Sequence, residues 1–296
     1  MRLQDALDHF VLQLEADGRS PHTIGNYRRH VALLARWLGA TDDLDEVTPQ
    51  TLARFLTSDV ARIDANGVAR SASTVNALRT SLRVFFGWLH GAGLVRTNAA
   101  RLVRRAICSP PPPKTLADDE IERLLATIAR DSTPEGKRDH AVFALIAWTG
   151  IRLSSAIGID VEDIDLGRAE IRLRRVKGDR TERVLLGPKS VALLTMYLGD
   201  RRSGPAFPAF HGGVLGRRQA ARRFELWLER AGLPHRGAHA LRHSFATRLY
   251  RQTGDVLLVR TALGHRSLES TLVYARADDV LLRAVLVPAE AGVSGG

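Results

Sequence analysis

The chain has 296 residues, of which 45% are hydrophobic and 25% charged, and its formal net charge at pH 7 is +11. This length favours two domains, and the composition is that of a globular rather than a disordered protein. The apolar runs are too short to span a bilayer, we expect no signal segment, and the single cysteine excludes an internal disulfide and a cysteine-based zinc cluster. The positive charge predicts a polyanionic partner, and we expect a cytoplasmic protein.

The first third of the chain predicts a compact bundle of about four helices. Apolar residues recur at helical spacing over residues 3–16, 21–38 and 49–56, and from residue 73 or 74 to residue 89. Two of these segments open with a capping residue followed by proline, Ser20-Pro21 and Thr48-Pro49. We therefore predict a helical domain over residues 1–107.

A proline-rich stretch then interrupts the helical pattern. Residues 109–113 read Ser-Pro-Pro-Pro-Pro, which favours an extended spacer because proline cannot continue a helix. We predict a linker over residues 108–114, with a second domain at residues 115–288 and a loose tail at 289–296.

The second domain is predicted to be mainly helical with one small β-hairpin. Helices are expected over residues 115–129 and over an apolar stretch, 139–148, that ends at Gly150. Alternation over 169–174 and 183–186, around a turn at 177–179, predicts the hairpin. Helical periods then follow at 191–197, 217–231, 240–252, 257–263, 268–275 and 279–287.

A group of side chains in this second part has the chemistry to act on a phosphodiester. Its members are Arg152, Lys177, His239, Arg242, His265 and Tyr274. His239 and Arg242 share one helix face. We expect Arg152 and Arg242 at element junctions. Their guanidinium groups would stabilise negative charge on phosphate oxygens. Tyr274 is the candidate nucleophile, activated by neighbouring cations or a base because its ordinary pKa is about 10. Each residue alone has an ordinary structural interpretation, and His243 is interpreted as structural.

No paired carboxylates with metal-ligand spacing accompany these residues, so we expect a metal-independent reaction without a cofactor. Tyr27, Tyr197 and Tyr250 are weaker candidates for the nucleophile because each lies within a helical apolar pattern.

Five sequence boxes resemble the tyrosine recombinase (phage integrase) family. They are Thr-Gly-Ile-Arg-Leu-Ser at 149–154, Val-Lys-Gly-Asp-Arg-Thr-Glu-Arg-Val-Leu-Leu at 176–186, His-Ala-Leu-Arg-His-Ser-Phe-Ala-Thr at 239–247, Leu-Gly-His-Arg-Ser at 263–267 and Thr-Leu-Val-Tyr-Ala-Arg at 271–276. Segments at 22–29, 36–39 and 113–116 are similar to the core-binding domain and linker of the Xer subgroup. The resemblance implies a SAM-like, DNA-binding first domain and a catalytic second domain.

By this resemblance, Tyr274 attacks a scissile phosphate to form a 3′-phosphotyrosyl bond. Arg152, Arg242 and His265 would hold the non-bridging oxygens, His239 would assist the tyrosine proton, and Lys177 would protonate the leaving 5′-oxygen. One position departs from the family, because Ser155 stands where members usually carry Glu or Asp three residues after the first arginine. Two alternatives remain open: a catalytically silent DNA-binding protein, and a type IB topoisomerase-like relaxing enzyme.

The partner implied is double-stranded DNA in the nucleoid, bound by a homotetramer or by a heterotetramer with a related recombinase. A DNA translocase is a further candidate partner, and no membrane is involved. Chromosome partition by dimer resolution and a plasmid or mobile-element role are both open. Candidate DNA contacts are Arg28, Arg79, Arg83, Arg217, Arg218 and Arg222. Residues 278–287 would dock on a neighbouring subunit or pack on their own domain.

Overall fold

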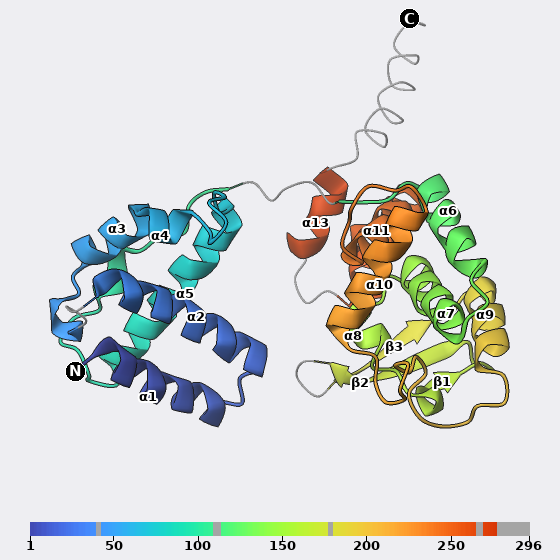
Figure 1. Ribbon diagram of the computed structural model, residues 1–296, viewed down its shortest axis with the longest axis horizontal. Helices are drawn as coiled ribbons and strands as arrows, with labels where there is room; N and C mark the ends of the chain where they lie inside the picture. Colours follow the sequence, from blue (N-terminus) through green and yellow to red (C-terminus); the bar gives the residue numbers. More distant parts are fainter. Residues whose placement is uncertain (40–42, 109–113, 177–179, 265–268, 277–296) are drawn as a thin grey trace, which may run out of the picture. The chain divides into compact units, whose positions relative to one another are not determined.

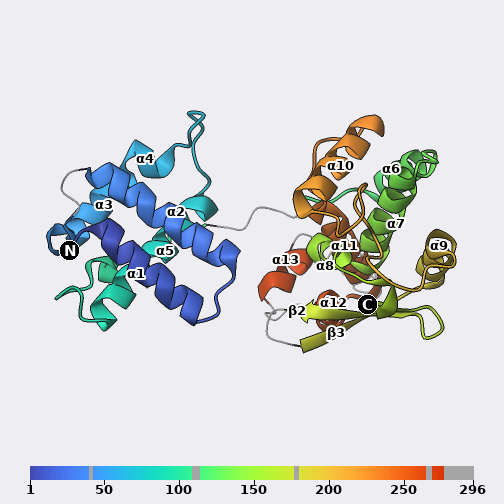
Figure 2. The same ribbon diagram turned by 60° about the horizontal axis from the view of Figure 1, so that its bottom comes forward.

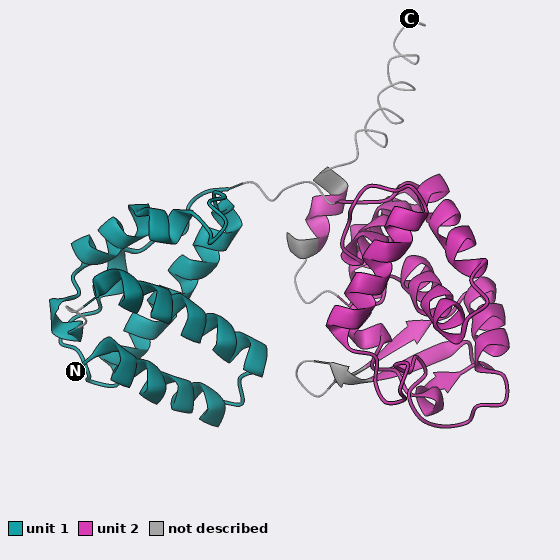
Figure 3. Ribbon diagram, in the orientation of Figure 1, with its two compact units in different colours: residues 1–110 teal, residues 111–296 magenta. Residues whose placement is uncertain are grey.

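The computed structural model describes residues 1–39, 43–108, 114–176, 180–264 and 269–276. It divides into two compact units, Met1–Pro110 and Pro111–Gly296 (Figure 3). The predicted spacer at 109–113, the segment 278–287 and the tail all lie outside the described residues. Among the described residues, no helix is long and apolar enough to cross a membrane.

The regular elements of the first unit are all helices among its described residues (Figure 1). Its α-helices are α1 (Leu3–Ala16), α2 (Pro21–Leu38), α3 (Pro49–Thr57), α4 (Asp59–Arg62) and α5 (Ala72–Gly91), joined by the 3₁₀ turns η1 (Leu44–Glu46) and η2 (Ala99–Leu102). The expected helix caps are present, since the side chains of Ser20 and Thr48 accept from backbone N–H groups three residues on. Helix α5 begins slightly earlier than predicted, because Ser71 rather than a later residue provides its cap.

Aromatic rings fill the centre of the first unit. Phe10 of α1 meets Tyr27 of α2 and Phe85 of α5 edge-on, with ring centroids 5.5 and 5.3 Å apart. Edge-to-face packing of this kind adds to the burial of apolar area. The three long helices α1, α2 and α5 are therefore held through one shared ring, Phe10, which is 2% exposed.

The second unit combines helices with a three-stranded antiparallel sheet of order β1-β2-β3. The strands are β1 (Ile164–Asp165), β2 (Glu170–Val176) and β3 (Arg180–Leu185), and β2–β3 is the predicted hairpin. The helices are α6 (Asp118–Ala129), α7 (Pro134–Thr149), α8 (Leu153–Ala156), α9 (Pro188–Leu198), α10 (Arg217–Arg230), α11 (His239–Thr253), α12 (Val256–Leu263) and α13 (Glu269–Arg276), with the 3₁₀ turn η3 (Val161–Asp163). The mainly helical fold with a small sheet is thus confirmed.

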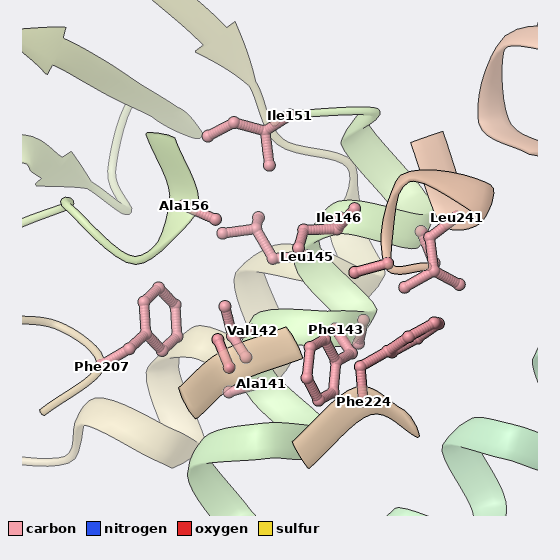
Figure 4. Packing of buried hydrophobic residues seen from close by; sticks show 14 of the residues in the cluster. Ala141, Val142, Phe143, Leu145, Ile146, Ile151, Ala156, Phe207, Phe224 and Leu241 are labelled. Carbon is pink, nitrogen blue, oxygen red and sulfur yellow. The ribbon is translucent and has the colours of Figure 1, made fainter. Parts of the chain in front are cut away.

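Helix α7 is the core of the second unit. Helices α6, α9, α10 and α11 all pack against it (Figures 1 and 2). Its apolar residues are buried except for Trp148, which is partly buried. Figure 4 shows Phe143 facing Phe224 of α10, and their ring centroids lie 5.1 Å apart. Helix α7 starts five residues earlier than predicted, because Thr133 caps it and Pro134 opens it.

A buried charge cluster at the start of α7 explains why its first turns look polar. The carboxylate of Asp139 accepts hydrogen bonds from Arg138, at 2.8 Å, and from the Nε1 of Trp227, also at 2.8 Å. Arg223 of α10 donates to the same carboxylate. The Asp139 side chain is 1% exposed, so these donors replace the water that would otherwise solvate its charge.

Both flanks of the proline-rich stretch are fixed to helices of their own unit. In the first unit, the Asn76 side chain of α5 donates to the carbonyl of Ala106 at 3.0 Å and accepts from its N–H at 2.8 Å. In the second unit, the Ser244 hydroxyl of α11 accepts from the N–H of Leu116 and donates to its carbonyl, both at 2.8 Å. The chain is therefore anchored where it leaves one unit and where it enters the other.

Candidate active site

The first turn of α11 buries a catalytic candidate, Arg242. This residue lies inside the helix rather than at the element junction expected from the sequence. Its Nη1 donates to the carbonyl of Gly150 at 2.6 Å, and its Nη2 donates to the carbonyl of Leu263 at 2.8 Å. Only 2% of the residue is exposed. The ends of α7 and α12 thus fix both amino groups of one guanidinium.

Arg242 remains charged at neutral pH although it is buried. Burial and the neighbouring Arg152 lower the pKa of Arg242 to about 10, while Tyr274 and Glu182 act in the opposite direction. The guanidinium therefore remains a cation at neutral pH. The two carbonyl groups that accept its hydrogen bonds are neutral, so they orient the guanidinium without cancelling its charge.

Gly150 makes this arrangement possible at the end of α7. Its φ of 68° lies in the left-handed region, which suits glycine as a helix terminator. A Cβ at this position would lie 2.4 Å from a ring carbon of Phe245, so a larger residue does not fit. Arg152, two residues later, is half-buried and starts the short helix α8. Its position brings the predicted first arginine close enough to influence the titration of Arg242.

The predicted nucleophile Tyr274 lies in α13 and is buried against α11 and α12. It is 2% exposed and packs with Ala246, Val259 and Leu263. Its hydroxyl oxygen lies 2.8 Å from Nδ1 of His243. Burial raises the pKa of Tyr274, although Arg242 and Arg152 oppose this rise. The phenol is therefore protonated at neutral pH.

His243, interpreted as structural from the sequence, is the hydrogen-bond partner of the tyrosine. Burial, followed by the nearby His239 and Arg242, lowers the pKa of His243 to about 4. With both groups neutral, we assign the phenol as donor and Nδ1 as acceptor. The sequence carried one signal for this role, because His243 lies four residues after His239 and so shares its helix face.

The ring of His239 contacts the ring of His243 rather than the tyrosine hydroxyl. The rings of His239 and His243 meet edge-on with centroids 4.6 Å apart. Burial lowers the pKa of His239, and the charges of Arg242, Arg152 and Arg217 lower it further. The two histidines therefore form a neutral pair beside the arginines.

Arg152 and Arg242 both line a small cavity of about 80 Å³. Arg152, Ser155, Glu182, Arg242 and Gly264 are among the residues that line it, and they come from α8, β3, α11 and the end of α12. Two predicted site residues, Lys177 and His265, lie outside the described residues. The described part of the chain contains no group of three His, Cys, Asp or Glu side chains arranged to hold a metal ion.

Comparisons with known proteins identify the family of this chain. Residues 114–280 match the phage integrase family, and residues 7–93 match the phage integrase N-terminal SAM-like domain. The chain belongs to the phage integrase family. The expected resemblance to Xer recombinases is confirmed by its relatives.

Two curated relatives in this family are Xer proteins. The tyrosine recombinase XerC of Chromobacterium violaceum is 32% identical and aligns over 93% of this chain and 91% of its own length. The tyrosine recombinase XerD of Mycobacterium tuberculosis is 32% identical over 93% of this chain and 92% of its own.

Solved structures of phage integrase family proteins share the fold. The XerH site-specific recombinase bound to its difH substrate, in a pre-cleavage complex, has a TM-score of 0.68 and 25% identity, covering 90% of this chain and 81% of that one. A lambda integrase dimer bound to a core site has a TM-score of 0.74 with 20% identity, covering 95% and 96%. At that identity the second likeness concerns the fold alone.

The candidate DNA contacts of this integrase-family chain lie mostly on open helix faces. Five are exposed: Arg28 on α2, Arg83 on α5, and Arg217, Arg218 and Arg222 on α10. Arg79 is half-buried and donates to the side chain of Asn76 at 3.0 Å. Arg217 also influences the titration of His239, so the start of α10 lies close to the candidate active site. Their contacts with DNA stay predictions.

Proposed function

We propose that this site-specific tyrosine recombinase breaks and rejoins DNA through Tyr274, with Arg152 and Arg242 as the described cations of the site. The observation that carries the proposal is the convergence of a buried tyrosine hydroxyl, a neutral histidine and two arginines on α8, α11 and α13. The geometry supplies a nucleophile, a proton acceptor and a positive site for phosphate oxygens.

The arginines would act on the charge that develops during attack. As the tyrosine oxygen approaches phosphorus, negative charge grows on the non-bridging oxygens, and a preoriented guanidinium stabilises it without reorganising. Arg242 is preoriented by the carbonyls of Gly150 and Leu263. By the family resemblance, His265 would add a further contact to these oxygens.

The proton of the nucleophile has a short path to His243. The Nδ1 atom of this residue lies 2.8 Å from the Tyr274 hydroxyl, whereas the sequence assigned the role to His239. In the free protein His243 is a weak base, because burial, the neighbouring His239 and the charge of Arg242 lower its pKa to about 4. A bound phosphate would offset the charge of Arg242 and raise the basicity of the imidazole pair.

The reaction would exchange one phosphoester bond for another. A bond forms between the Tyr274 oxygen and phosphorus, and the bond from phosphorus to the 5′-oxygen breaks. By resemblance, Lys177 gives a proton to that leaving oxygen. The phosphotyrosyl link retains the energy of the broken bond, so a free 5′-hydroxyl can reverse the step and rejoin a strand.

The proposal extends to the assembly and its setting. We propose a homotetramer, or a heterotetramer with a related recombinase, acting on two duplex sites in the nucleoid of the cytoplasm. This is the arrangement implied by the family resemblance, and the relatives resemble this chain over most of their length. A DNA translocase as a further partner, and a role in chromosome dimer resolution or in mobile-element recombination, belong to the same proposal.

Covalent trapping tests the nucleophile directly. Nicked duplexes from the native locus are incubated with wild type, Tyr274→Phe and, as a matched control, Tyr250→Phe, and a DNA-linked protein band is sought on a denaturing gel. We expect the band with wild type and Tyr250→Phe, but not with Tyr274→Phe, and we expect EDTA to leave it unchanged. DNA binding without any covalent band from wild type would instead indicate a catalytically silent DNA-binding protein.

A relaxation assay separates a recombinase from a topoisomerase-like enzyme. Supercoiled plasmid without a native site is treated at low protein concentration, where assembly of several protomers is disfavoured. A recombinase leaves such a plasmid supercoiled. Efficient relaxation by wild type, lost in Tyr274→Phe, would contradict the recombinase proposal while retaining the tyrosine chemistry.

A further inference from the structure

The small cavity beside Arg152 and Arg242 contains an unexpected carboxylate. Family members usually place an acidic residue three positions after the first arginine, and here that position is Ser155, which is half-buried and lines the cavity. Among the described residues that line it, Glu182 of β3 is the acidic one. The negative charge missing from α8 is therefore present on the hairpin.

The register of the hairpin places Glu182 on the inner face of the sheet. Glu182 pairs with Leu173, and Val184 pairs with Ile171, in antiparallel register. Directly opposed residues share one face of the sheet, and Leu173 and Ile171 are buried on it. Glu182 thus occupies a position where this face otherwise carries apolar side chains. A charge placed there needs a compensating charge nearby.

The neighbouring backbone leaves room for this carboxylate. At the end of α12, Gly264 has a φ of 59°, and a Cβ built on it would lie 2.9 Å from Oε2 of Glu182. The preceding residue, Leu263, provides the carbonyl that accepts from Arg242. Glu182 therefore lies against the turn that orients one catalytic arginine.

We propose that Glu182 supplies, from β3, the carboxylate that the family usually carries at the position of Ser155, and that it holds the Arg152–Arg242 pair in place. The inference rests on the proposed function, because it assigns a positioning role within that site. Two guanidinium groups around a cavity of about 80 Å³ repel each other, and a fixed carboxylate offsets this repulsion. The nearby charge of Glu182 also favours the charged form of Arg242.

The role differs from that of a residue that contacts the phosphate. Among the described residues, Glu182 accepts no hydrogen bond from either arginine, so it does not occupy the N–H groups that Arg242 has left beside its bonds to Gly150 and Leu263, nor those of Arg152. A carboxylate in direct contact with the phosphate would weaken DNA binding. We therefore expect Glu182 to affect the rate of covalent bond formation more than the affinity for DNA.

A rescue experiment tests this assignment. The rate of covalent adduct formation on the nicked duplex is measured for wild type, Glu182→Gln, Ser155→Glu/Glu182→Gln and, as a control at an exposed acid, Glu229→Gln. We expect Glu182→Gln to lower the rate about 10- to 100-fold, in the range caused by small misplacements of catalytic groups. The double variant, which returns the carboxylate to α8, is expected to recover most of the lost rate, and Glu229→Gln to react as wild type.

Two further readouts separate positioning from folding and from DNA binding. Thermal melting identifies variants that do not fold, and DNA affinity, measured in the Tyr274→Phe background, is expected to change less than threefold, or about 0.6 kcal/mol. Should Glu182→Gln fail to fold, Ser155→Glu alone carries the test. A second carboxylate in a cavity that already holds one is expected to lower the rate or leave it unchanged.

The failures of the two proposals are distinguishable. An adduct with wild type, together with an equal rate for folded Glu182→Gln, would overturn only the role of Glu182. No rescue in a folded double variant, or a faster reaction for Ser155→Glu alone, would do the same. No adduct from wild type on DNA that it binds would overturn the proposed function itself.

Discussion

The two ends of α7 hold buried arginines in different ways. At its start, Arg138 donates to the carboxylate of Asp139 at 2.8 Å and to the carbonyl of Pro208 at 3.0 Å. At its end, Arg242 is held by two carbonyl groups, those of Gly150 and Leu263. An ion pair fixes a guanidinium and neutralises it, whereas carbonyls fix it and leave its charge available for a phosphate. We therefore infer that the first end serves stability, and the proposed function assigns chemistry to the second.

Removing the charge at the active end should have the largest effect. For Arg242→Gln we expect covalent adduct formation to fall by about 10³-fold or more, because a preoriented stabiliser of the transition state is lost. Single-turnover trapping on nicked duplex measures the rate. A variant that folds and reacts within tenfold of wild type would contradict the assignment of Arg242.

Removing the charge at the structural end should produce the reverse pattern. Asp139→Asn leaves Arg138 and Arg223 without their buried carboxylate, so we expect a loss of about 3–5 kcal/mol in unfolding free energy. Chemical denaturation measures this loss. The adduct rate per folded molecule is expected to stay within twofold of wild type, and a large drop in that rate would erase the distinction between the two ends.

A smaller effect is expected at Gly150, the glycine at the end of α7 whose carbonyl accepts from Arg242. For Gly150→Ala we expect a loss of about 1–3 kcal/mol from backbone strain and a roughly tenfold slower adduct rate. The reason is that a Cβ would lie 2.4 Å from the ring of Phe245 and would displace the Gly150 carbonyl. The matched control is Gly232→Ala, where φ is also positive, at 64°, but nothing lies within 4 Å of the added atom. This control should lose stability and keep its adduct rate.

The smallest expected effect is a pH dependence of stability from His243. Its pKa falls from 6.5 to about 4 on folding, so the unfolded chain binds a proton in this interval and the folded chain does not. The stability contributed by neutral His243 is therefore present above pH 6.5 and lost as the pH falls toward about 4. The full difference corresponds to about 3.4 kcal/mol at 1.36 kcal/mol per pKa unit, and solvent screening of the partly exposed ring leaves an expected loss of about 1 kcal/mol.

Melting curves of wild type and His243→Asn over this interval isolate the contribution of one residue, because His30, His140 and His239 also have lowered pKa values and remain in both proteins. We expect wild type to lose more stability than the variant as the pH falls. Parallel curves would show that His243 titrates normally in the folded protein.

The sequence predicted the long helices and the hairpin because their signals are local. Caps such as Ser20 and Thr48, and the alternation of β2 and β3, involve neighbouring residues only. The short elements α4 and β1 escaped prediction, since four and two residues carry no period. The start of α7 was missed for another reason: Arg138 and Asp139 look like surface residues, and only the distant Arg223 and Trp227 allow their burial.

In the candidate site, too, contacts between residues distant in the sequence were not predicted. Its family boxes named Arg152, His239, Arg242 and Tyr274, and the structure brings these residues together on neighbouring elements. The partner of Tyr274 could not be chosen from the sequence, because His239 and His243 share one helix face and only α13 distinguishes them. Likewise, the alternation of β3 places Glu182 on the inner face of the sheet, but nothing local indicates that the cavity next to Ser155 lies there.

Ser244 couples the start of the second unit, at Leu116, to helix α11. The Ser244 hydroxyl accepts from the N–H of Leu116 and donates to its carbonyl. In the sequence of α11, Ser244 lies between His243 and Phe245. These two hydrogen bonds connect the start of the second unit directly to the first turns of α11, which carry Arg242. Tension applied at Leu116 would therefore reach α11 through these bonds, in parallel with the backbone that leads into α6.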